Sequence, residues 1–326
     1  MLLDKNFFLT DMEYLYLLIC LVIIVFSADW LVAGAVTIAK RFKISNFVIG
    51  AVIVGIGTSL PELVVSSIGA IDGNSDIAIG NVVGSNIFNI LGILGLTVVI
   101  MPVAVSRENK RFDLPFCIGL SLLTLLLVCN FFLGGEHTIN RIDGLILLLV
   151  FALFMFLSLR NGKSNQTTDS DEVVTNKQLT FGICKVVFGL AALIISSRFF
   201  LDNAIVIAKA WGVNDAFIAI TLVACGTSLP ELAASLVAAA KKNTQLALGN
   251  VIGSCIFNLA LILGAASQIT PLTSAGITII DYIVMIVAVI TPLLFGFKGK
   301  LNRWAGAFML LCFIAYNAYL IYTQTN

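Results

Sequence analysis

The chain has 326 residues, of which 59% are hydrophobic and only 11% are charged, and its formal net charge is +1. Soluble domains carry about 25% charged residues, so a soluble domain of this composition is excluded. The sequence also has no basic run suited to nucleic acid, so no nucleic-acid partner is expected. Runs of about 20 apolar residues match a hydrocarbon core about 30 Å thick. The composition therefore predicts an all-α polytopic membrane protein.

Hydropathy predicts ten membrane-spanning helices. In the first half they lie near 14–39, 46–71, 76–100, 114–134 and 141–159, and in the second half near 182–208, 214–240, 245–269, 277–297 and 303–323. The segment between the halves is rich in Asn, Ser, Thr and Asp, which predicts a flexible linker. The predicted domains are a first five-helix half at 1–159, a linker at 160–181 and a second five-helix half at 182–326.

The basic residues predict how the chain crosses the membrane. With the predicted spans, fifteen of the nineteen Lys and Arg residues fall on the same side, including those around the linker. Under the positive-inside rule this side is cytoplasmic. Both termini are therefore expected outside, with a cytoplasmic linker.

An internal repeat is the dominant feature of the sequence. A shift of 169 residues lays Gly57–Pro102 on Gly226–Pro271, and 24 of these 46 positions are identical. Because each half holds an odd number of predicted spans, the second copy would enter the membrane from the opposite side. Such inverted-topology repeats are typical of secondary transporters, whose binding site lies between the repeats near the middle of the membrane.

The first repeated block, GTSLPEL, places a proline and then a glutamate inside an apolar run. The proline removes a backbone donor and disrupts the preceding helical turn, so each copy is expected to contain a broken helix. Free backbone carbonyls are expected near Gly55–Thr58 and 224–227, and hard cations prefer such oxygen ligands. Glu62 and Glu231 would each cost roughly 2.5 kcal/mol or more facing lipid, so they are expected to be partners around a cation.

The second repeated block adds neutral oxygen groups. Four serines beside the predicted breaks are expected to be ligands: Ser59, Ser228, Ser85 and Ser254. Asn89 lies one helical turn beyond Ser85, and Asn258 one turn beyond Ser254, so both asparagines can offer further oxygens. Ser66 and Ser235 are expected to bond back to their own helices. For Asn81 and Asn250 two roles stay open: ligand, or support for a broken helix.

The chemistry of these groups favours particular ions. Two carboxylates balance one Ca²⁺, or two Na⁺ with room for another Na⁺ on neutral ligands. The two blocks are rich in oxygen and contain few sulfur ligands, which argues against Zn²⁺ or Cu⁺. Ca²⁺ and Na⁺ are therefore the expected substrates, no cofactor is expected, and apart from the lipid bilayer no obligate partner is evident.

The two blocks, GTSLPEL and GN-V/I-x-G-S-x-I-F-N, resemble the alpha-repeats of sodium/calcium exchangers of the prokaryotic kind, in the calcium/cation antiporter superfamily. The resemblance implies that Glu62 and Glu231 are shared by Ca²⁺ and Na⁺, with the carbonyls of Thr58 and Thr227 completing the calcium site. It also implies two sodium sites. One is formed by Ser59, Ser85 and the Gly55 carbonyl, and the other by Ser228, Ser254 and the Ala224 carbonyl. Asn89 and Asn258 would form a pair of amides between them.

The resemblance implies a secondary antiporter, not an enzyme, in a prokaryotic plasma (inner) membrane. It would exchange Na⁺ for Ca²⁺ and export Ca²⁺ electrogenically. Some potassium-dependent members carry Asp where this chain has Asn258, so potassium-independent exchange is expected. Ca²⁺/H⁺ antiport is the alternative. A cation channel and an intramembrane hydrolase using Ser59 or Ser228 are further alternatives; neither serine comes with a membrane-embedded His or Lys base.

Overall fold

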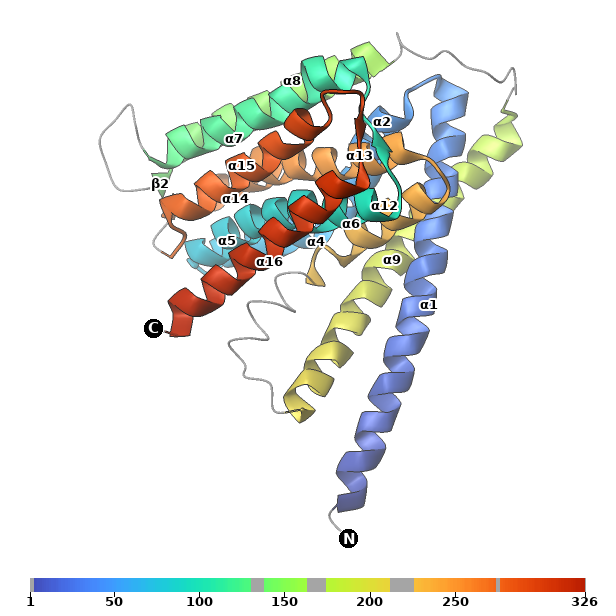
Figure 1. Cartoon of the computed structure of the whole chain (residues 1–326), viewed down its shortest axis with the longest axis vertical. Coiled ribbons are helices and arrows are strands. Elements are labelled where there is room, and N and C mark those ends of the chain that lie inside the picture. The colour runs from blue at the N-terminus through green and yellow to red at the C-terminus, as the bar shows by residue number, and fades with distance from the viewer. Residues whose placement is uncertain (1–2, 130–137, 163–173, 212–225, 274–275, 326) are drawn as a thin grey trace.

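The computed structural model describes residues 3–129, 138–162, 174–211, 226–273 and 276–325. The described chain is almost wholly helical (Figure 1). The helices of its first half are α1 (Leu3–Phe42), α2 (Asn46–Ile49), η1 (Gly50–Gly55), α3 (Ile56–Thr58), α4 (Leu60–Ile71), α5 (Ser75–Ile87), η2 (Phe88–Leu94), α6 (Gly95–Ile100), η3 (Asn109–Asp113), α7 (Leu114–Val128) and α8 (Arg141–Gly162). Those of its second half are α9 (Asn176–Ala210), α12 (Leu229–Ala240), α13 (Thr244–Ile256), η5 (Phe257–Ile262), α14 (Leu263–Ile269), α15 (Ile279–Phe295) and α16 (Arg303–Thr325).

Seven helical stretches of the described chain are long and apolar enough to cross a membrane. An eighth consists of Asn46–Thr58 and Leu60–Ile71, bent by 46° at the junction. The helices α12 and α15, in the regions of two further predicted spans, are shorter. Large apolar side chains point outward from the outer helices, as Phe26 (67% exposed) and Leu311 (65% exposed) do. This surface suits a lipid environment, and the fold is that of a helical membrane protein.

Helices extend into both ends of the polar segment between the halves. Helix α8 continues to Gly162, and α9 begins at Asn176, six residues before the predicted span. The early start has a local cause, because the hydroxyl of Thr175 accepts from the backbone N–H of Gln178, whose side chain in turn accepts from the N–H of Thr175. This capping box starts a helix before the apolar residues begin.

Helices α1 and α9 form a long pair that extends away from the other helices (Figure 1). Their contacts show that the two helices are antiparallel. Tyr14 accepts a hydrogen bond of 3.0 Å from the indole of Trp211 at one end of the pair, and Gly34 packs on Gly182 towards the other end.

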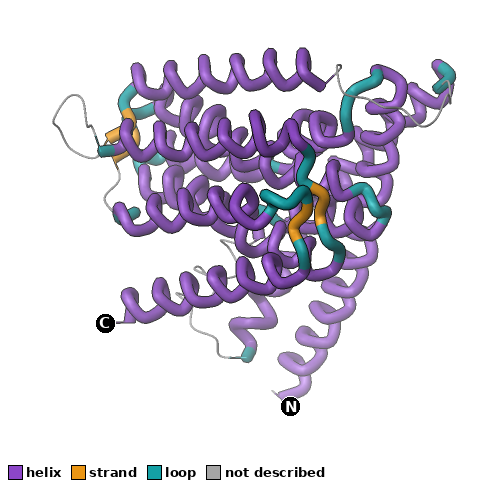
Figure 2. Tube along the Cα trace, turned by 45° about the horizontal axis from the view of Figure 1, so that its top comes forward, coloured by secondary structure: helices purple, strands orange, loops and turns teal. Residues whose placement is uncertain are grey.

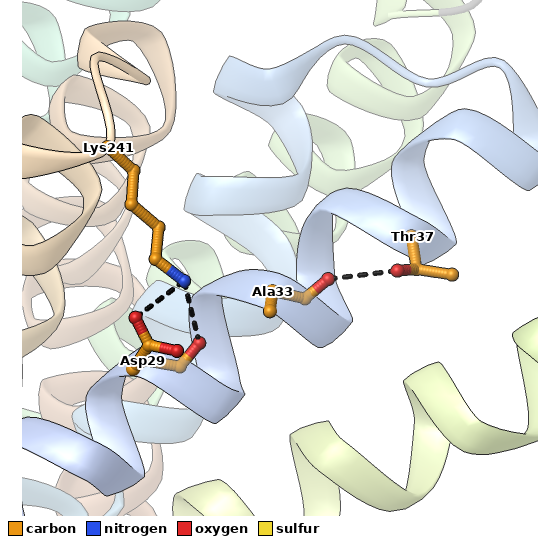
Figure 3. Close-up of polar contacts among 4 residues, drawn as sticks. All are labelled: Asp29, Ala33, Thr37 and Lys241. Atoms are coloured by element: carbon orange, nitrogen blue, oxygen red, sulfur yellow. Dashed lines mark hydrogen bonds and ion pairs between the residues drawn. The ribbon is translucent and has the colours of Figure 1, made fainter.

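An ion pair joins helix α1 to the inner bundle (Figure 3). The Lys241 Nζ, directly after α12, lies 2.6 Å from Asp29 Oδ1 and 3.3 Å from the Asp29 carbonyl oxygen. On the same helix, the hydroxyl of Thr37 donates to the Ala33 carbonyl. The ion pair therefore ties α1 to the end of α12.

Helix α13 lies at the centre of the bundle, against η1, α12, α2 and η2. Gly249 and Gly253 allow this, because a Cβ at either position would overlap the backbone of Phe47 or Ala51. The run from α13 to α14 and the run from α5 to α6 point in opposite directions (Figure 1).

Two short antiparallel strand pairs connect loops at separate places on the helix layer (Figure 2). In the first pair, β1 (Val103–Ala104) is joined to β4 (Lys300–Leu301), so the loop after α6 meets the loop before α16. In the second pair, β2 (Thr138–Ile139) is joined to β3 (Leu272–Thr273), so the loop before α8 meets the loop after α14. Each pair therefore joins one half of the chain to the other.

Candidate cation site

The predicted helix break occurs in the first copy at Ser59. This residue has φ −85° and ψ 9°, and its counterpart Ser228 has φ −92° and ψ 13°. Both lie outside helical geometry immediately before α4 and α12, which carry Pro61 and Pro230 in their first turns. A proline is tolerated there because a first-turn N–H has no partner within the helix. The residues upstream of the second break, 212–225, lie outside the described chain, and they include Ala224.

One expectation about the break is wrong. The Gly55 carbonyl is not free of helix bonding, because it accepts from the Ser59 N–H at 3.1 Å. It also accepts from the hydroxyl of Ser254 at 3.3 Å. The physical reason is that Pro61 lacks only the N–H that would reach Gly57, so the turn from Gly55 to Ser59 can still close.

The two glutamates are held across the repeat. The hydroxyl of Ser59 donates to Glu231 Oε1 at 2.7 Å, and the hydroxyl of Ser228 donates to Glu62 Oε1 at the same distance. All four residues have no exposed surface. The structure therefore brings both predicted carboxylates and both predicted serines into one buried cluster, in which each serine serves the glutamate of the other copy.

Two asparagines support the broken helices from within their own copy. Asn81 donates to the Glu62 carbonyl at 3.1 Å and to Ser66 at 2.9 Å. Its counterpart Asn250 donates to the Glu231 carbonyl at 3.1 Å and to Ser235 at 2.8 Å. The open question about these asparagines is thus answered in favour of support.

The expectation for Ser66 is wrong as well. Its hydroxyl donates to the Ala78 carbonyl of α5 at 3.3 Å and so bridges two helices instead of bonding back to its own. The close packing of α5 on α4 makes this acceptor available.

The central amides lie on widened helical turns. Asn89 belongs to the π-helical segment η2 and Asn258 to η5, and both are fully buried. Single π-turns are rare and are frequent at functional sites. Ordinary helix was expected here, since no residue pattern marks the inserted turn.

The remaining predicted residues also lie near the breaks, and two of them contact residues of the other copy. Ser85 lies against Ser228, with their hydroxyls 3.3 Å apart. The hydroxyl of Thr58 donates to the Val54 carbonyl at 3.0 Å and contacts Asn250 Oδ1 at 3.3 Å. Within the described chain, the Thr227 hydroxyl is buried without a hydrogen-bond partner. The predicted ligands other than Ala224 therefore gather around the two breaks and the two π-turns.

Four buried oxygens of this cluster have no donor among the described residues. They are Oε2 of Glu62, Oε2 of Glu231, and Oδ1 of Asn89 and Asn258. A buried acceptor without a partner costs about 1–3 kcal/mol, and more when it is charged. Carboxylate and amide oxygens are the preferred ligands of hard cations.

The described residues contain no group of three or more His, Cys, Asp or Glu side chains placed to hold a metal ion. Any site built here therefore consists of two carboxylates supplemented by neutral oxygens. One polar residue of this region was not predicted to belong to the site. It is Asn86, which is fully buried and bonds to Asn258. Two signals marked it: it is next to Ser85, and its equivalent in the second copy is Cys255.

Comparisons with known proteins identify the family of this chain. The family model described as sodium/calcium exchanger protein matches residues 12–160 and 181–322. CaxA of Alkalimonas amylolytica, to which an antiporter function is ascribed, is 37% identical over 323 residues, covering 95% of this chain and 98% of its own.

Two further relatives match over nearly their full lengths. The sodium/calcium exchanger MaX1 of Methanosarcina acetivorans is 34% identical, covering 95% of this chain and 99% of its own. The solved structure of the sodium-calcium exchanger NCX_Mj, soaked with 10 mM Na⁺ and zero Ca²⁺, superposes with a TM-score of 0.83 at 31% identity, covering 95% of this chain and 99% of that one. This protein therefore belongs to the sodium/calcium exchanger family.

Proposed function

We propose that this chain is a secondary active antiporter that exchanges Na⁺ for Ca²⁺ by alternating access. The observation that carries the proposal is the buried pair Glu62 and Glu231, each bonded by a serine of the other copy and each with one oxygen lacking a donor among the described residues. Two carboxylate charges balance one Ca²⁺ or two Na⁺. The two ions therefore compete for the same oxygens, and this competition couples their fluxes.

The proposed ligands are those predicted from the sequence. Ca²⁺ is held by the two glutamates with the carbonyls of Thr58 and Thr227, and Asn89 and Asn258 supply central amide oxygens. Na⁺ takes two neutral sets at the breaks, in which Ser85 and Ser254 are exchanged relative to the sequence prediction, because Ser254 donates to the Gly55 carbonyl and Ser85 lies against Ser228. One set is Ser59, Ser254 and the Gly55 carbonyl, and the other is Ser228, Ser85 and the Ala224 carbonyl.

The proposed topology has ten spans in two inverted halves, 1–159 and 182–326, with both termini outside and the segment between them in the cytoplasm. Support comes from equivalent elements that run in opposite directions, namely α1 against α9 and the α5–α6 run against the α13–α14 run. The strand pairs add support, because each joins the two halves at a separate end of the bundle. The prokaryotic relatives favour a plasma-membrane location.

Helices α1 and α9 are the proposed moving elements. A cavity of 260 Å³ separates the middle of α9 from the starts of α4 and α12, and its lining includes Pro61, Ser197 and Thr227. This space gives α9 room to shift against the two breaks. The ion pair between Asp29 of α1 and Lys241 would break and form again during that shift.

The exchange is proposed to be electrogenic, potassium-independent and directed towards Ca²⁺ export. With two carboxylates and two further neutral ligand sets, a third Na⁺ finds oxygen ligands but no balancing charge, so the sodium-loaded site carries one positive charge. Asn258 supports potassium independence, because it places a neutral amide at the centre where some potassium-dependent members carry Asp. A nearly full-length relative named as a sodium/calcium exchanger is consistent with this.

The test is ⁴⁵Ca²⁺ uptake into proteoliposomes under Na⁺, K⁺ and pH gradients imposed one at a time, with the membrane potential clamped. Uptake is expected with outward Na⁺ gradients only, and it should respond to the clamped potential. Uptake driven by a pH gradient alone would favour Ca²⁺/H⁺ antiport instead. Uptake that persists with no Na⁺ or H⁺ counter-ion on the far side would favour a channel.

A further inference from the structure

The two central amides are held differently, and the cause is one position at which the repeat departs from symmetry. The second block is nearly identical in its two copies, but Asn86 in the first stands where Cys255 stands in the second. Both residues are fully buried. A buried amide must find hydrogen-bond partners.

The orientation of the Asn86 amide follows from its neighbours. Its Nδ2 lies 3.3 Å from the Cys255 carbonyl oxygen and 3.8 Å from the Met285 sulfur. Both of these atoms can only accept a hydrogen bond, so this end of the amide must be the NH₂ group. Its oxygen is therefore on the opposite side, where it faces Asn258.

The orientation of Asn258 follows in turn. Its Nδ2 donates to Asn86 Oδ1 at 3.2 Å. An amide that presents its NH₂ group to one neighbour presents its oxygen on the other side. That oxygen, Asn258 Oδ1, is one of the buried acceptors without a donor among the described residues. Two hydrogen bonds, from Asn86 to the Cys255 carbonyl and from Asn258 to Asn86, thus fix which end of the Asn258 amide is available to a cation.

No hydrogen bond among the described residues orients the Asn89 amide in this way. Neither its Oδ1 nor its Nδ2 has a hydrogen-bond partner. The residue equivalent to Asn86 is Cys255, whose thiol lies 4.0 Å from the Asn86 carbonyl oxygen. A thiol is a weak donor and acceptor, and it cannot fix an amide as a carbonyl or a second amide does.

From this asymmetry we infer that Asn86 is a positioning residue, which holds the Asn258 amide with its oxygen towards the cation. The inference rests on the proposed function. Ca²⁺ takes six to eight oxygen ligands, so losing one oriented oxygen, or replacing it with an NH₂ group, weakens Ca²⁺ binding. Asn86 itself does not touch the ion, and its effect is on affinity more than on turnover.

The experiment replaces Asn86 with the residue of the other copy, as Asn86→Cys, and compares Cys255→Ala as the matched control. Apparent KM and maximal rate of Na⁺-driven ⁴⁵Ca²⁺ uptake are measured, together with the rise in melting temperature on adding Ca²⁺. Asn86→Cys is expected to raise the KM for Ca²⁺ by about fivefold or more, the size of one lost hydrogen bond, with the maximal rate nearly unchanged. Cys255→Ala should leave the KM unchanged, because its backbone carbonyl remains.

An Asn258→Asp background separates positioning from a general structural role. Both oxygens of a carboxylate are acceptors, so no donor is needed to choose between them. Asn86→Cys should then have little effect on the KM or on the Ca²⁺-dependent thermal shift. Equal losses in both backgrounds would overturn the inference, as would loss of Ca²⁺ binding in Asn258→Asp itself or an unchanged KM in Asn86→Cys. Failure of the unmodified protein to exchange Na⁺ for Ca²⁺ would instead refute the proposed function.

Discussion

Replacing either buried glutamate with glutamine should abolish Ca²⁺ transport while leaving the chain folded. Glu62 and Glu231 each accept a 2.7 Å hydrogen bond at Oε1 from a serine, and the amide oxygen of glutamine can accept the same bond. The change therefore keeps shape and removes one charge. Two unit charges 4 Å apart interact by about 4 kcal/mol at an effective dielectric constant near 20, so Ca²⁺ would lose about 8 kcal/mol and Na⁺ about 4 kcal/mol.

These losses predict unequal effects on the two ions. Since about 1.4 kcal/mol corresponds to a tenfold change in affinity, Ca²⁺ binding should weaken by more than about 10⁵-fold, and Na⁺ binding by about 10³-fold. Purified Glu62→Gln and Glu231→Gln proteins would be compared by ⁴⁵Ca²⁺ uptake and by thermal stabilisation with each ion. Asp202→Asn is the matched control, because this acidic residue of α9 is half exposed and pairs only with Arg198 among the described ion pairs. Retained Ca²⁺ uptake in both glutamine variants would refute the site, and equal losses for the two ions would refute the charge argument.

Three further changes test the geometry around the site. Ser228→Ala removes a hydrogen bond to a carboxylate, worth about 1.5–3 kcal/mol, and should weaken apparent Ca²⁺ affinity by about tenfold or more in uptake assays; an unchanged KM would contradict the role of the crossed bond. Asp29→Asn breaks the partly exposed pair with Lys241, whose worth is at most about 1 kcal/mol, so the transport rate should change by less than about fivefold without loss of folding. Gly253→Ala places a methyl group against backbone in the centre of the bundle and should lower the melting temperature, whereas Gly119→Ala, with no described atom within 4 Å, should not.

The sequence predicted the parts of the site that depend on local chemistry. A proline followed by a glutamate inside an apolar run is enough to predict a broken helix and a buried acid, and both are found at Ser59 and Glu62. The repeat added the second acid, Glu231. These predictions succeed because the loss of a backbone donor at proline and the cost of a carboxylate in lipid hold whatever the tertiary fold is.

Other features could not be predicted, because they depend on how the two copies pack. The sequence places Ser59 near Glu62, but the hydroxyl bonds to Glu231 of the other copy. The π-turns that carry Asn89 and Asn258 have no residue signature. The bond from Ser254 to the Gly55 carbonyl likewise arises only where α13 crosses the first break. Contacts between copies are set by helix packing, which the repeat constrains but does not specify.

The crossed bonds also bear on how ion binding could drive the transport cycle. Because Glu62 is held by Ser228, and Glu231 by Ser59, neither copy contains a complete site alone. Any movement that separates the two breaks must lengthen these bonds, and it then leaves each buried carboxylate without its serine donor. A cation between the carboxylates holds the two copies together by attraction to both, and the ion-free pair depends on the serines instead. A ligand shifts a conformational equilibrium only by its difference in affinity for the two states. The carboxylate pair supplies such a difference, since its charge is fully compensated only when both copies face the same ion.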